Sequence, residues 1–239
     1  MADLLLAAAS FGVFLFAALA QAVTGFGSAL VAVPLLTLAV DPVTAVVAST
    51  TVGLVLTAGS WRHERLHADA VQVRRLTLAG VLGMPLGLVA LALCDEHTLT
   101  RLIGGVLLAL VGLLSLGVRL PEGGATAWTA GVVSGGLLTS TGMNGPPLVL
   151  ALQGLEPRRY RATLQAVFCG QDAVAVAAFI AMGHLSTGVL LLTATGVLGL
   201  PLGWAIGDRV FRRVPAERFR LIVLGGLTVT AVTVLAGGL

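Results

Sequence analysis

The chain has 239 residues, of which 57% are hydrophobic and only 10% are charged, and its mean hydropathy is +1.00. This composition excludes a water-soluble domain, because apolar stretches near the ~20 residues that cross a bilayer recur along the whole chain. The net charge of +3 does not indicate nucleic acid as a partner, since every basic residue is an arginine and nearly all lie at the ends of apolar stretches. The arginines instead indicate membrane topology.

The sequence also lacks the motifs of common enzymes and metal sites. Cys94 and Cys169 form no CxxC motif, which argues against a metal site and a disulfide framework. No HExxH, GxSxG or GxxxxGK[ST] motif occurs. We therefore expect no enzymatic activity, no cofactor and no metal.

In chain order, the first predicted element is a broken hairpin over residues 4–40. Its entering arm, 4–23, is long enough to span a membrane, and the glycine-rich run Thr24–Ser28 interrupts it. The returning arm, 29–40, covers roughly 18 Å, which is short of the ~30 Å hydrocarbon core. The apolar stretches that follow are predicted to be transmembrane helices, because a helix satisfies its own backbone in lipid; they are 43–60, 76–94 and 102–118.

The second half of the chain repeats this pattern. The octapeptide GVLGMPLG at 80–87 recurs as GVLGLPLG at 196–203, which indicates a tandem duplication. Residues 126–155 form a second predicted hairpin, with a polar, helix-breaking tip at 139–147 and a returning arm too short to cross the bilayer. The predicted spans that follow are 162–183, 185–207 and 221–239.

The arginine distribution favours a returning hairpin at 126–155. If this segment returns, thirteen of the fourteen arginines lie on the cytoplasmic side, whereas a single crossing splits the clusters five against eight. Each repeat, 1–122 and 123–239, then has a hairpin and three spans. An odd number of crossings inverts the second repeat relative to the first. Both termini are then outside, and Met1–Asp3 lacks the positive region of a signal peptide.

The two hairpin tips are predicted to meet near the bilayer midplane, where transporters of this architecture bind solutes. The first turns of the returning arms, at Ser28 and Gly145, would present free N–H groups that attract anions, although Pro146 and Pro147 remove two donors from the second. Helix packing and bonds back to the same helix are the alternative roles of such residues. The predicted substrate-binding residues are Thr24, Gly25, Phe26, Gly27, Ser28, Ser140, Thr141, Gly142, Asn144, Gly145 and Gln165.

Of the eleven acidic residues, only Asp172 lies well within a predicted span. Because a charge at the bilayer centre is costly, this carboxyl should be neutral, paired or facing water. Two hypotheses remain open. Asp172 takes up a proton as the anion moves, or it is a protonated structural residue bonded to a neighbouring helix.

The run TGFGSALVAVPLL at 24–36, the run STGMNGPPL at 140–148 and the repeated octapeptide resemble the sulfite exporter TauE/SafE family, also called the toluene sulfonate uptake permeases. The resemblance covers essentially the whole chain. It implies a multi-pass secondary carrier of the cell (cytoplasmic) membrane for sulfite, organosulfonates or related small sulfur-containing anions, with membrane lipid around it. From the inverted repeat we expect alternating access, in which one repeat moves against the other around the paired tips.

Other functions stay open at this point. An anion-selective channel, a carrier of another small anion such as a carboxylate, and a non-transporting membrane scaffold are all compatible with the same hairpins. The sequence does not fix the oligomeric state, and a homodimer is one option.

Overall fold

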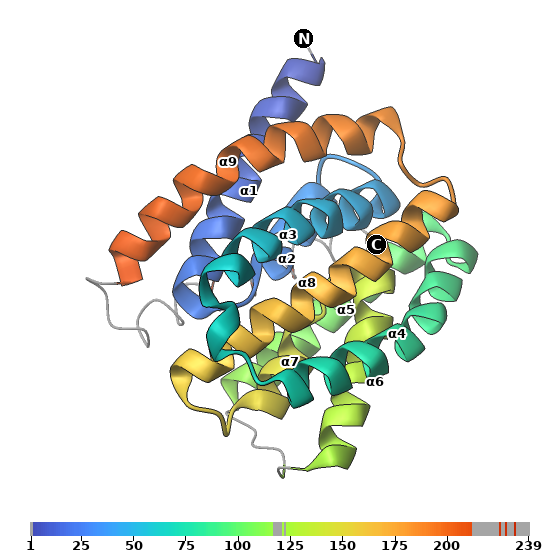
Figure 1. Cartoon of the computed structure of the whole chain (residues 1–239). Coiled ribbons are helices and arrows are strands. Elements are labelled where there is room, and N and C mark those ends of the chain that lie inside the picture. The colour runs from blue at the N-terminus through green and yellow to red at the C-terminus, as the bar shows by residue number, and fades with distance from the viewer. Residues whose placement is uncertain are drawn as a thin grey trace.

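The computed structural model describes residues 2–116, 121, 123–211, 225, 228 and 232, and all regular structure within them is helical (Figure 1). The elements are α1 (Ala2–Thr24), α2 (Ser28–Leu36), α3 (Pro42–Glu64), the short 3₁₀ helix η1 (Arg65–His67), α4 (Ala70–Leu93), α5 (Glu96–Ser115), α6 (Gly124–Thr141), α7 (Gly145–Leu152), α8 (Pro157–Ala181) and α9 (Thr187–Phe211).

Six segments of the described chain are long and apolar enough to cross a membrane: Leu4–Thr24, Pro42–Arg62, Ala70–Leu93, Glu96–Leu113, Arg158–Ala181 and Thr187–Val210. The last five overlap five of the predicted spans, and the first is the entering arm of the first hairpin. The predicted span 221–239 lies almost wholly outside the described residues. The prediction of an all-helical polytopic membrane protein is confirmed.

Two helices begin earlier than their apolar stretches. α4 starts six residues before the predicted 76, because the Asp69 carboxylate accepts bonds from the N–H groups of Val71 (3.0 Å) and Gln72 (3.2 Å) and caps a polar first turn. α8 starts at Pro157 rather than at 162, with proline in the first turn, where its missing N–H costs nothing. Hydropathy alone misses such polar turns.

Both hairpins consist of a long helix, a short break and a short helix. Gly25 and Gly27 have φ of 81° and 101° in the first break, and Gly142 has φ of 72° in the second, a region that L-residues with side chains rarely adopt. The returning helices α2 and α7 have nine and eight residues, which gives lengths of about 13 and 12 Å. Neither reaches across a bilayer, as predicted.

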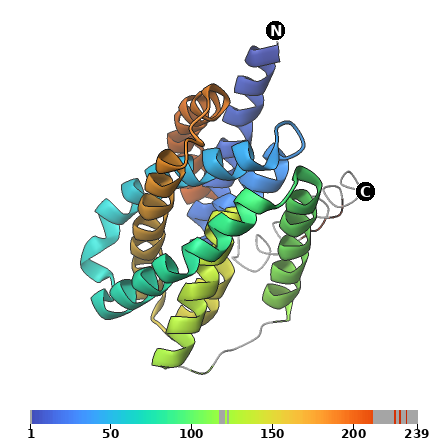
Figure 2. The ribbon, with the colours of Figure 1, turned by 90° about the vertical axis from the view of Figure 1, so that its right-hand side faces the viewer.

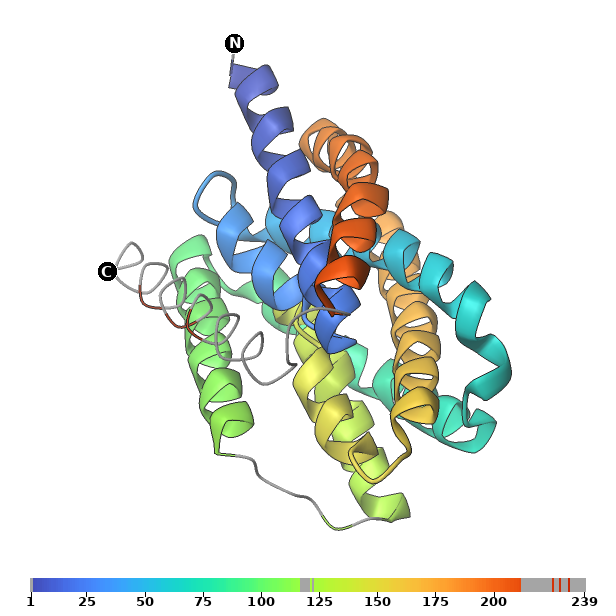
Figure 3. The same cartoon turned by 90° about the vertical axis from the view of Figure 1, so that its left-hand side faces the viewer.

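The two halves of the chain exchange packing partners. α9 lies along α1 (Figures 1 and 3), and α4 lies along α6 (Figure 2). Each copy of the duplicated octapeptide therefore packs on the long hairpin helix of the other half. A Cβ at Gly83 would overlap the Val132 carbonyl oxygen, and a Cβ at Gly199 would lie 2.7 Å from the carbonyl oxygen of Phe11. The glycines of the repeat allow these close helix approaches.

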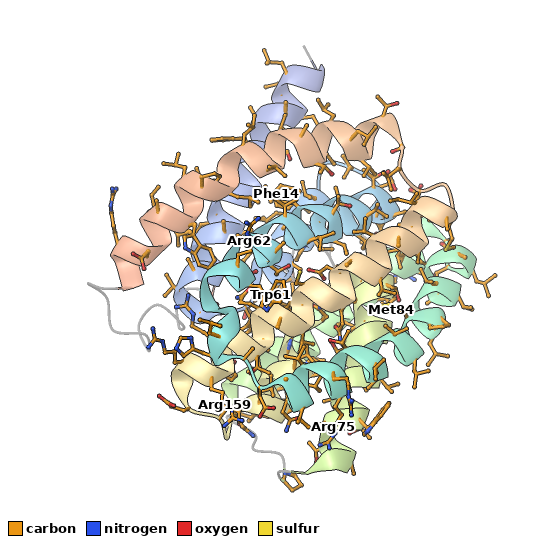
Figure 4. The ribbon with its side chains drawn as sticks, in the orientation of Figure 1. Phe14, Trp61, Arg62, Arg75, Met84 and Arg159 are labelled. Carbon is orange, nitrogen blue, oxygen red and sulfur yellow. The ribbon has the colours of Figure 1, made fainter. Side chains whose placement is uncertain are left out.

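Buried side chains reinforce both interfaces (Figure 4). The Thr139 hydroxyl of α6 donates to the Met84 carbonyl of α4 (2.8 Å), and Phe14 of α1 occupies the space above Gly196 of α9. α3 and α8 pack against each other, and each also contacts the octapeptide helix of the other half, α9 or α4. Together they form the central wall of the bundle.

One end of the bundle collects the described arginine-rich loops. Arg159 Nη2 lies 2.8 Å from Asp69 Oδ2, and the Asp69 N–H donates to the Thr163 hydroxyl (2.9 Å). Arg75 and Arg159 both lie at the lower end in Figure 4. The loop before α4 and the loop before α8 are therefore on the same side of the molecule.

Candidate functional site

The two hairpin breaks meet inside the bundle. A Cβ placed on Gly145, the first residue of α7, would lie 3.4 Å from Phe26 Cδ2 in the first break. A Cβ on Gly142 would lie 2.8 Å from Val33 Cγ2 of α2. Residues more than 100 positions apart in the sequence thus meet, with the first break against the start of α7 and the second break against α2.

A cavity lies between the first turns of α2 and α7 on one side and the wall formed by α3 and α8 on the other. It has about 390 Å³ of space outside atoms, including space open to solvent. Six helices contribute, and the described residues that line it are Gln21, Gly27, Ser28, Ala29, Leu30, Ser49, Thr50, Gly53, Thr57, Leu138, Gly142, Met143, Asn144, Gly145, Phe168 and Asp172.

The structure brings half of the predicted site residues to this cavity. The residues that line it are Gly27, Ser28, Gly142, Asn144, Gly145 and Asp172. The residues that lie outside the lining are Thr24, Gly25, Phe26, Ser140, Thr141 and Gln165. No substrate contact is established for either group, so the site remains a prediction.

The hydroxyls outside the cavity hold the shape of the breaks. Thr24 donates to the carbonyl of Ala20 (2.8 Å) and also lies against the carbonyl of Phe26. Ser140 and Thr141 donate to carbonyls one turn back in α6, each at 2.8 Å. These are the bonds to the same helix that the alternative interpretation expects.

Two glutamines of α8 fix the two breaks. The fully buried Gln165 accepts from Gln21 Nε2 (3.2 Å) and donates to the Gly25 carbonyl (3.1 Å). Gln171 Oε1 accepts from Asn144 Nδ2 (3.3 Å) and lies 2.9 Å from Ser134 Oγ, while its Nε2 donates to the carbonyl of Leu76 in α4 (3.1 Å). Gln165 therefore positions the first break.

The cavity offers hydrogen-bond donors mainly from the first half of the chain. The first N–H groups of an α-helix have no partner within the helix, and those of Ser28, Ala29 and Leu30 begin α2 at the cavity. In α7 the prolines follow Gly145 directly, so this end has fewer donors. Ser49, with 3% exposure, also lines the cavity, and its hydroxyl has no described hydrogen-bond partner.

Asp172 brings the only acidic side chain to the cavity lining within the described residues. It is 5% exposed, and its Oδ2 lies 3.5 Å from the Thr57 hydroxyl of α3. Gly53 of α3 faces the same oxygen, since a Cβ there would lie 3.5 Å from it. The carboxyl therefore sits where α3 and α8 pack together.

Sequence reasoning missed the wall that α3 contributes. Ser49, Thr50, Gly53 and Thr57 line the cavity, but a predicted span gave no reason to single them out. Their spacing of one, four and eight residues places small and polar side chains on one face of a helix. That spacing is the signal that could have identified them.

The fold and the cavity together define a polytopic helical membrane protein in which two broken hairpins enclose a buried, partly polar site. A family model described as Sulfite exporter TauE/SafE matches residues 10–234. The chain belongs to the sulfite exporter TauE/SafE family, a family of membrane transporters, as its motifs predicted. Searches of curated proteins and of solved structures found no match.

Proposed function

We propose that this protein is a secondary transporter of small sulfur-containing anions, such as sulfite or organosulfonates, and that it binds them between its two hairpin breaks. The observation that carries the proposal is the cavity in which the first turn of α2, the first turn of α7 and the wall of α3 and α8 converge. Helix N-termini in a buried site favour anions. The family supports sulfur oxyanions as the class of cargo.

The protein is an inverted repeat in this proposal, and it exposes the cavity alternately by moving one repeat against the other. The exchanged packing of α1 with α9 and of α6 with α4 supports a two-fold relation between the halves. The Arg159–Asp69 ion pair supports it as well, because it keeps two arginine-rich loops on one side. That arrangement requires residues 126–155 to return.

Cysteine labelling tests this topology. In a background without Cys94 and Cys169, single cysteines at the exposed positions Arg74 and Arg158 should react with a membrane-impermeant maleimide from the cytoplasmic side. A cysteine at the exposed position His97, in the first turn of α5, should react only from the other side. Labelling of positions 74 and 158 from opposite sides would contradict the inverted repeat.

Flux measurements test transport itself and the part that Asp172 plays. Purified protein in liposomes should carry radiolabelled sulfite or an organosulfonate, and an imposed proton gradient should change the rate. In Asp172→Asn, flux should no longer respond to the gradient, because the amide cannot take up a proton. Wild-type liposomes without flux, or a variant with the full gradient response, would contradict transport or proton coupling respectively.

Asp95→Asn is the matched control for this variant. Asp95 is exposed between α4 and α5, and a hydrogen bond with the Thr98 side chain lowers its pKa, so the substitution removes one charge outside the cavity lining. Its flux should keep the wild-type gradient response. A loss in both variants would point to surface charge rather than to the cavity carboxyl.

A further inference from the structure

The described residues that line the cavity between the breaks offer little positive charge. Within the described chain its lining contains no arginine, lysine or histidine. Arg161 packs against the first break, where its Cγ lies 3.3 Å from the position of a Cβ on Gly25, and it is not among the residues that line the cavity. The N-termini of α2 and α7 each act as about half an elementary charge, so together they supply at most about one.

The remaining groups favour an anion but oppose a second negative charge. The buried Ser49 hydroxyl has no described partner and faces the cavity, so it can donate to a bound oxyanion. Asp172 lies on the same lining, and when ionised it repels a ligand in proportion to the charge of that ligand. The only ionisable side chain among the described lining residues is therefore an acid.

We propose that the cavity selects singly charged oxyanions over doubly charged ones. The Born cost of taking an ion out of water rises with the square of its charge, and the two helix ends balance about one charge. A dianion would keep about one charge uncompensated beside Asp172. This inference rests on the proposed function and narrows its cargo to sulfonates and hydrogensulfite, with sulfate and fully ionised sulfite excluded.

The lining of the cavity also offers apolar side chains to the organic part of a sulfonate. Leu138, Met143 and Phe168 are buried and line it beside the donors. An apolar substituent in place of the fourth oxygen of sulfate would contact these side chains rather than require further hydrogen bonds. Charge and shape thus favour the same class of ligand.

Competition and calorimetry test the selection. Methanesulfonate and perchlorate, each with one charge, should inhibit radiolabelled sulfite flux at concentrations at least about tenfold lower than sulfate, because only the singly charged ions match the helix ends. Perchlorate carries one charge but has no methyl group, so its affinity reports the effect of charge without apolar contact. Titration calorimetry of the purified protein should give the same order of affinities. Sulfate that binds as tightly as methanesulfonate would overturn the inference.

The flux measurements test the proposed transport, and the binding measurements test the charge selection independently of it. Selective binding without any sulfite flux would leave the charge selection in place and contradict transport. Flux with equal inhibition by all three ions would contradict the selection and leave transport in place. The two claims are therefore distinguishable in one set of measurements.

Two variants locate the selection in the cavity. At a pH where the Asp172 carboxyl is ionised, Asp172→Asn should reduce the preference for methanesulfonate over sulfate by at least about threefold, while Asp95→Asn should keep it. Ser49→Ala should weaken methanesulfonate binding by roughly 2- to 13-fold through the lost hydrogen bond. Thr51→Ala, next to the lining on α3, should leave binding unchanged, because its hydroxyl donates to the Val47 carbonyl. An unchanged preference in Asp172→Asn would overturn the role of this carboxyl.

Discussion

Gly27→Val should abolish most anion flux while the protein remains folded. Gly27 precedes the first turn of α2 at the cavity with φ of 101°, and a β-branched residue is strongly disfavoured there. Backbone strain of about 1–3 kcal/mol corresponds to a loss of roughly 5- to 150-fold in the population of the correct break. The valine side chain would also narrow the cavity, so flux in liposomes should fall by at least this factor.

A second glycine provides the control for this variant. Gly12 lies in α1, and a Cβ there would meet nothing within 4 Å. Gly12→Val should therefore retain wild-type flux and the same elution profile in detergent. Normal kinetics in Gly27→Val would move the binding site away from the first break.

Gly83→Val should strongly destabilise the fold. A Cβ at this position would overlap the carbonyl oxygen of Val132 in α6, and a backbone atom cannot move aside as the end of a side chain can. Overpacking of this kind costs about 1–3 kcal/mol and occasionally more, so the variant should melt roughly 2–12 °C lower or fail to accumulate. The thermal transition of the detergent-purified protein measures the effect.

The comparison variants come from both halves of the chain. Gly199→Val, at the equivalent position of the second octapeptide, should be similarly destabilised, since its Cβ would lie 2.7 Å from the Phe11 carbonyl oxygen. Gly105→Val in α5, where nothing lies within 4 Å, should keep wild-type stability. Equal melting temperatures for positions 83 and 105 would show that α4 and α6 are not so closely packed in the membrane.

Hydropathy and helix-breaking residues were sufficient to predict most elements of the fold. Apolar length identified five spans, and Gly25, Gly27 and Gly142 identified the breaks, because the backbone there needs conformations open mainly to glycine. The first turns of α4 and α8 were missed, since they are polar and depend on a cap or a proline. The helices that would pack together could not be predicted, because partner choice depends on side-chain fit across the interface.

The candidate site was predictable where backbone chemistry defines it and not elsewhere. Gly27, Ser28 and Gly145 line the cavity because they adjoin helix starts, which the sequence marks. Gln165 was predicted to face a ligand, but the structure uses both ends of its amide on Gln21 and Gly25. A span sequence shows that a glutamine is buried and does not show which partner satisfies it. The same is true of Ser49, whose position depends on the packing of α3.

The helix α8 is hydrogen-bonded to both hairpin breaks, and this limits how the breaks can move relative to it. α8 contacts the first through Gln165 and the second through Gln171. In the proposed transport cycle, a movement that carries the first break away from α8 must break the two Gln165 hydrogen bonds together, each with a net strength of about 0.5–1.5 kcal/mol. Two hydrogen bonds of that strength break by thermal motion, yet they still define a discrete resting state. Lengthening or shortening the Gln165 side chain should therefore change how often the first break moves in the proposed cycle, without altering the residues proposed to contact the ligand.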